Sequence, residues 1–97
     1  MLRITVQSEA DRIRLKLEGE LAGAWVSEVE DSWRKTHSTH GDRPLYLDLT
    51  AVERVDRAGR YLLGLMRHSG THLIASGTMM TELVKTIEDD WPVAGAR

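Results

Sequence analysis

The chain has 97 residues, of which 41% are hydrophobic, and 13 Lys and Arg against 15 Asp and Glu give it a formal charge of −2. This length holds one domain with one core, the hydrophobic fraction excludes a disordered chain, and the charge argues against a dedicated nucleic-acid binder, which needs excess cations for phosphate contacts. Cysteine is absent, which excludes disulfides, thiolate metal sites and a thiol nucleophile and favours a reducing compartment.

No segment has the features of a membrane or export signal. No apolar run approaches the roughly 18 residues that span a bilayer, and residues 1–12 contain no apolar stretch of the signal-peptide kind. We therefore expect a cytoplasmic protein without direct membrane insertion.

Two segments near the N-terminus alternate apolar and polar residues, over residues 2–7 and 12–18. Such alternation is typical of half-buried strands, and the short polar link over residues 8–11 favours an antiparallel hairpin. The outward positions of the hairpin predict a locally positive face. The cations on that face are Arg3, Arg12, Arg14 and Lys16.

A helix is predicted after Gly19, because apolar residues recur at helical spacing between residues 22 and 33, opposite a charged side. Trp25 and Trp33 fall on the apolar side. We expect both rings to pack in the core, with an exposed contact patch at one of them as the alternative. Gly41 ends this helix.

Alternating leucines predict a third strand over residues 45–50, followed by a loop over residues 51–55. Asp56 is a good N-cap for the next helix, whose apolar side runs to Met66. Residues 73–75 predict a short fourth strand.

Thr78 is a plausible cap for the last helix, and Pro92 makes its continuation unfavourable. Because Met79 and Met80 are adjacent in this helix, one of them must point away from the core, which hints at a protein contact.

The predicted order is β-β-α-β-α-β-α. It indicates an α/β fold with a mixed sheet of four to five strands and helices packed on one side. Residues 1–90 form a single domain, and residues 91–97 are expected to be a C-terminal tail rather than an edge strand.

Motifs for cofactors and catalysis are missing. Gly59 and Gly64 have the glycine spacing of a P-loop without its lysine, so we expect them to let a helix pack closely on the sheet. The pairs His37 with His40 and His68 with His72 lack further convergent ligands, and no G-x-S-x-G elbow is present. The sequence therefore predicts a protein that is not an enzyme and holds no metal or cofactor.

Residues 53–60 are the most informative segment. They place a helix N-terminus directly after a parallel strand, where open α/β sheets present their binding sites. Arg54, Arg57 and Arg60 add positive charge there. An ordinary capped helix start with solvent-facing arginines and a partner-recognition loop both fit this pattern.

Residues 45–55, followed by Asp56-Arg57-Ala58-Gly59, resemble the strand, loop and D-S-S-G helix start of STAS domains, which are named for sulfate transporters and anti-sigma-factor antagonists. Residues 15–21 resemble the family's L-x-G-E-L-D segment, and residues 73–77 resemble its next strand. The similarity covers roughly residues 2–88.

This resemblance implies a module that binds regulatory proteins and catalyses nothing. In the antagonists, an unphosphorylated hydroxyl at the D-S-S-G helix start lets the module bind a kinase-type anti-sigma factor, and phosphate breaks the contact. The implied contact surface combines the loop over residues 54–60 with the turn over residues 20–23. Its members are Glu20, Leu21, Arg54, Asp56, Arg57, Ala58, Gly59 and Arg60.

The sequence departs from the family pattern at the phosphorylated position. Arg57 stands where the family has its phosphorylated serine, Ala58 is its neighbour, and Ala22 replaces the Asp of G-E-L-D. An arginine neither accepts phosphate nor mimics it, so we expect an antagonist-like module that is constitutive or regulated differently. The alternatives are an accessory STAS subunit of a membrane transporter, such as an anion permease or a lipid-transport ATPase, and a domain that binds a nucleotide or small ligand.

Overall fold

The computed structural model describes residues 1–39 and 41–94, in which four strands form one sheet accompanied by three helices. In the sheet the strands lie in the order β1-β2-β3-β4; the β1/β2 pair is antiparallel and the other two pairs are parallel. The predicted α/β class and element order are confirmed. In chain order the elements are β1 (Leu2–Ser8), β2 (Ile13–Leu21), α1 (Trp25–Thr39), β3 (Leu45–Val55), α2 (Arg57–His68), β4 (His72–Ile74) and α3 (Thr78–Asp90).

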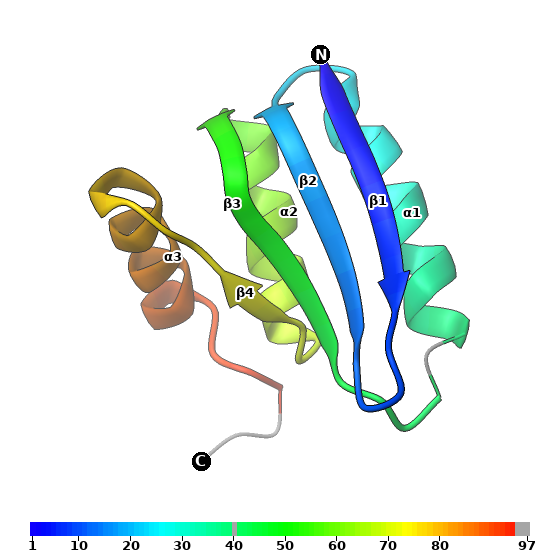
Figure 1. The fold of residues 1–97 in the computed structure, drawn as a ribbon. Helices are drawn as coiled ribbons and strands as arrows, with labels where there is room; N and C mark the ends of the chain where they lie inside the picture. Colours follow the sequence, from blue (N-terminus) through cyan, green and yellow to red (C-terminus); the bar gives the residue numbers. More distant parts are fainter. Residues whose placement is uncertain (40, 95–97) are drawn as a thin grey trace.

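The helices provide the crossovers that parallel strands require. Figure 1 shows α1 and α2 behind one face of the sheet, and α3 beside β4, where it packs on α2. Within the described ranges, no helix is long and apolar enough to cross a membrane.

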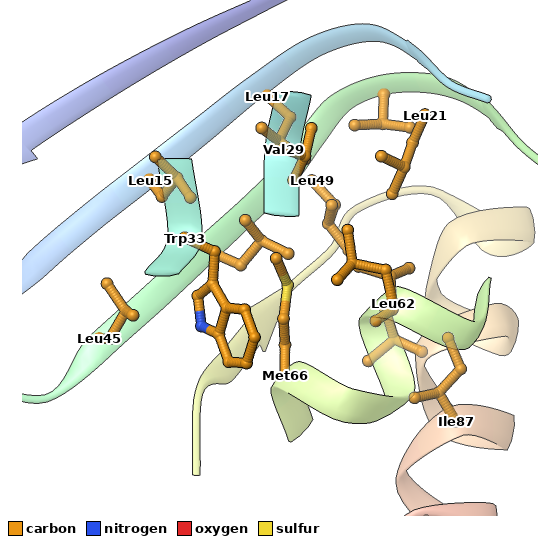
Figure 2. Close-up of a cluster of buried hydrophobic side chains, with 14 of the residues drawn as sticks. Leu15, Leu17, Leu21, Val29, Trp33, Leu45, Leu49, Leu62, Met66 and Ile87 are labelled. Carbon is orange, nitrogen blue, oxygen red and sulfur yellow. The ribbon is translucent and has the colours of Figure 1, made fainter. Parts of the chain in front are cut away.

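The core lies between the sheet and the helices, because the inward positions of β2 and β3 are leucines (Figure 2). Trp33 is buried among them, as predicted, and its indole Nε1 donates to the Thr71 hydroxyl at 3.0 Å. The buried N–H therefore has a partner. The inward leucines are Leu15, Leu17 and Leu21 of β2 and Leu45, Leu47 and Leu49 of β3.

Trp25 does not pack in the core, so that prediction is wrong. Its side chain is 39% exposed. Trp25 is the first residue of α1, at the end of the sheet, and the later turns of the helix supply the buried residues Val29 and Trp33. Helical spacing identifies the inward side of α1 but not how much of that side the sheet covers.

β3 continues through residues 51–55, where the alternation pattern predicts a loop, so that prediction is wrong. The cause is a register shift in the pairing of β3 with β2, between Lys16 and Glu18. A bulge changes the face to which the following side chains point. After Leu49, the next buried residue of β3 is therefore Val52, three positions on rather than two.

Gly59 packs α2 closely against the sheet, as predicted. A Cβ at this position would lie 2.5 Å from the Leu21 carbonyl oxygen, too close for a real contact. Gly64 is packed against a different group, since a Cβ there would overlap the indole ring of Trp91. The expectation that both glycines face the sheet is therefore wrong for Gly64.

The chain after α3 runs back along α2 instead of forming a free tail. The Trp91 ring meets the Tyr61 ring edge-on, with centroids 5.3 Å apart. The Ala94 N–H donates to the His68 carbonyl at 2.9 Å. This part of the predicted tail therefore packs on the domain; residues 95–97, like His40, lie outside the described residues.

The start of α3 differs from the prediction. Its N-cap is Gly77, with φ 80° and no side-chain cap bond, so capping by Thr78 is wrong. Met79 is 79% exposed and Met80 is partly buried, as expected for adjacent helical residues. The helix ends at Asp90, before the proline, as predicted.

The sheet face opposite the helices carries charges that are largely offset. Arg3 lies opposite Glu18 in the β1/β2 register, and Arg14 Nη1 lies 3.8 Å from Asp48 Oδ2. The positive face predicted from the hairpin alone is therefore weaker than its cations suggest, because carboxylates on the same and neighbouring strands offset them.

Exchanging Gly64 for alanine tests the packing of Trp91 on α2. Helix propensity alone favours alanine by about 1 kcal/mol, but the overlap with the indole ring costs about 1–3 kcal/mol. We therefore expect Gly64→Ala to lower the free energy of unfolding in urea, and the same change in a Trp91→Ala background to raise it. A stabilising effect in both backgrounds would show that the ring does not pack there.

Candidate partner-binding site

The carboxyl ends of β2 and β3 meet the starts of α1 and α2 at one edge of the sheet (Figure 1). The two strands are paired to their last residues, Leu21 with Val55. Asp56 follows at once, and its N–H donates to the Leu21 carbonyl at 3.2 Å. We name this region, residues 20–23 and 54–60, the α2 corner.

Asp56 holds the α2 corner together with both carboxylate oxygens. Its Oδ1 accepts from the Gly59 N–H at 2.8 Å, and its Oδ2 accepts from the Gly23 N–H at 2.9 Å. The first bond confirms the predicted cap, and the second ties α2 to the turn after β2. The Gly23 N–H and then the Gly59 N–H lower the pKa of Asp56 from its ordinary value, because both bonds favour the charged carboxylate.

The turn between β2 and α1 is shorter than predicted. Glu20 and Leu21 are the last residues of β2, so the turn comprises residues 22–24. Gly23 in this turn has φ 59°, in the left-handed region that favours glycine. Sequence reasoning missed its bond to Asp56, although a glycine just after a strand was the available signal.

The arginines of the α2 corner differ in their partners. Arg54 Nε lies 3.3 Å from Glu20 Oε2, across the β2/β3 pair. Arg57 and Arg60 are exposed, and neither forms an ion pair with another residue in the described part of the chain. The α2 corner therefore presents two guanidinium groups that form no ion pair within the described part of the chain.

Two of the residues expected at the contact surface are buried. Leu21 is fully buried, and Gly59 is buried against it. They position α2 against β2 and do not reach the surface, which corrects the expectation for these two. The expected residues that are at least partly accessible are Glu20, Arg54, Asp56, Arg57, Ala58 and Arg60.

Two grooves flank the exposed side of α2. The smaller, of about 400 Å³, lies between the end of β3 and the start of α3. The larger, of about 690 Å³, lies between α1 and α2, and we name it the α1–α2 groove. Neither was predicted, because each is formed by elements that meet only in the folded chain. The α1–α2 groove is lined by Val26, Glu30, Arg57, Ala58, Tyr61, Leu62 and Leu65.

The groups exposed at this edge can form charge and apolar contacts with another molecule. Exposed guanidinium groups pair with carboxylates, and the neighbouring apolar grooves accept apolar side chains. In residues 1–39 and 41–94, no three His, Asp or Glu side chains are grouped so that they would hold a metal ion.

No family model matches the chain, and no curated protein matches it. Among solved structures, it is similar to an anti-sigma factor antagonist from Mycobacterium paratuberculosis, with a TM-score of 0.75 and 17% identity over 99% of this chain and 87% of that chain. It is also similar to an uncharacterized DUF3478-family protein with a SpoIIAA-like fold from Shewanella loihica PV-4, with a TM-score of 0.62 and 14% identity over 96% of this chain and 81% of that chain. The chain adopts the SpoIIAA-like fold.

The SpoIIAA-like fold confirms, at the level of the fold, the resemblance to STAS domains. A third similarity is to Mglu, with a TM-score of 0.61 and 25% identity over 77% of this chain but only 19% of that chain. The same arrangement of strands and helices thus occurs both as nearly a whole chain and as a small part of a longer one.

The lowered pKa of Asp56 makes the α2 corner sensitive to acid. The Asp56 carboxylate stabilises the fold fully above the ordinary aspartate pKa of about 3.9. This stabilisation is lost as the pH falls through the lower pKa of Asp56 in the folded protein. We expect Asp56→Asn to be less stable than the wild type at neutral pH, with the difference shrinking below about pH 4. Urea unfolding of both proteins across this range measures the difference; one that stays constant would contradict the two-bond arrangement of the carboxylate.

Proposed function

We propose that this chain is a non-enzymatic protein-binding module that acts in the cytoplasm like an anti-sigma-factor antagonist and contacts its partner through the α2 corner. The expected partner is a regulatory protein of the kinase-type anti-sigma-factor kind. One observation carries the proposal. In this SpoIIAA-like fold, Asp56 bonds both α2 and the turn after β2, and Arg57 occupies the first helical position of α2 beside them.

The extent of the structural similarity supports this assignment. The anti-sigma factor antagonist matches nearly the whole of this chain, and most of its own length is matched in return. The similarity thus extends over the whole fold of this chain and not over a part of it. The accessible groups at the α2 corner are suited to a protein surface, since they combine cations with apolar grooves.

Arg57 separates this module from a phosphorylation switch. Asp56 caps α2 and Arg57 follows it, which is the order of the D-S-S-G helix start with the serine replaced. A guanidinium group cannot accept phosphate, so the switch of the antagonists has no acceptor at this position. We infer that binding is constitutive or is regulated at another place.

Treatment with kinase-type anti-sigma factors and ATP tests the missing switch. We expect the intact mass of the wild type to stay unchanged, because Arg57 has no hydroxyl. Arg57→Ser is the matched variant, and phosphorylation of this variant alone would indicate that only the acceptor was lost. Stoichiometric phosphate on wild-type residues 56–60 would refute the proposal.

Charge reversal at Arg57 tests the contact surface. We expect Arg57→Glu to weaken partner binding by roughly 2 kcal/mol or more, about 30-fold, as for an anchor residue. Quantitative affinity capture with mass spectrometry measures this against Lys85→Glu, an exposed cation on α3. Equal capture by all three proteins would move the interface elsewhere, and capture of a membrane transporter complex would favour the accessory-subunit alternative.

A further inference from the structure

We propose that the α1–α2 groove receives the apolar side of an acidic amphipathic helix of the partner, of which one carboxylate pairs with Arg57. This inference rests on the proposed function and specifies the chemistry of the partner. It follows from the shape of the groove and from the distribution of charge on its two walls.

The shape of the groove suits a short helical segment. Leu62 is buried beneath it, while Val26 and Leu65 are partly accessible on opposite walls. Tyr61, which is 59% exposed, extends the apolar lining to the surface. From Ala58 to Leu65 the α2 wall is about 10 Å long, which matches about two turns of a helix with apolar side chains at i, i+3 or i+4, and i+7.

The two walls differ in charge. On the α1 wall, Glu30 accepts from Arg34 Nη2 at 2.7 Å and from Arg34 Nε at 3.1 Å, so its charge is offset within α1. On the α2 wall, Arg57 lines the groove, is exposed and has no ion pair in the described part of the chain. An occupant with carboxylates along one edge complements this asymmetry, whereas a basic occupant is repelled.

The same charges disfavour a second copy of this chain as the occupant. In a two-fold dimer through this groove, the same surface of both copies takes part in the contact. The Arg57 side chains of the two copies would then face one interface without an unpaired carboxylate on the groove walls to meet them. A partner that carries its own carboxylates avoids this repulsion.

Two synthetic peptides test the proposal on the ¹⁵N-labelled full chain. Each is long enough for about four helical turns on binding, with Leu at i, i+3, i+4 and i+7; the remaining positions are Glu in the acidic peptide and Lys in the basic one. We expect the acidic peptide to shift the amide resonances of Val26, Tyr61 and Leu65, and the basic peptide to leave them unchanged.

Three variants separate charge from shape. Arg57→Glu reverses the charge of the α2 wall, and Ala58→Phe fills the groove from an exposed position. Each should lower the affinity for the acidic peptide by about tenfold or more. Lys85→Glu should stay within about twofold of the wild type. Arg57→Glu should also gain affinity for the basic peptide, a result that loss of structure would not produce.

The outcomes also distinguish this inference from the proposed function. If Arg57→Glu lowers capture of the natural partner but the wild type does not bind the acidic peptide, the α2 corner remains the contact surface and the acidic helix is wrong. Equal binding of both peptides, shifts on the open sheet face instead of the groove, or a dimer that Ala58→Phe dissociates would each overturn the inference. If Arg57→Glu leaves partner capture unchanged, the proposed function fails independently.

Discussion

The carboxylate of Asp56 is the interaction on which the rest of the α2 corner depends. One oxygen caps α2 through Gly59, and the other holds the turn after β2 through Gly23. Parallel pairing alone brings β2 and β3 side by side, but this side chain joins the segments that follow them. Because both oxygens are engaged within the chain, Asp56 serves to hold the α2 corner together.

Close packing on two sides fixes the position of α2 at the α2 corner. At Gly59 the helix backbone approaches Leu21 at the end of β2, and at Gly64 it receives the ring of Trp91 from the chain after α3. A helix packed on both sides holds the backbone of its arginines in one place, so a contact made there would order side chains and not the backbone. Arg57 therefore sets the chemistry of the exposed side of α2 and takes no part in holding the helix in place.

Local patterns in the sequence were sufficient for most of the fold. Alternation identified the strands, helical spacing identified the inward side of α1 with Trp33, and Asp56 marked the start of α2. The alternation failed beyond Leu49, because a register shift against β2 moves the next inward position to Val52. That shift is a property of two paired strands and has no signal in either strand alone.

The sequence by itself determined the order of the elements, the location of the candidate site after β3 and the chemistry of its exposed arginines, since all of these depend on residues close together in the chain. Only the tertiary structure decided that Gly23 completes the bonding of Asp56, that Leu21 lies beneath the surface, and that α1 and α2 enclose a groove. The physical reason is that a hydrogen-bond partner, a buried position and a groove each require two segments to meet, and their meeting is set by the packing of the whole core.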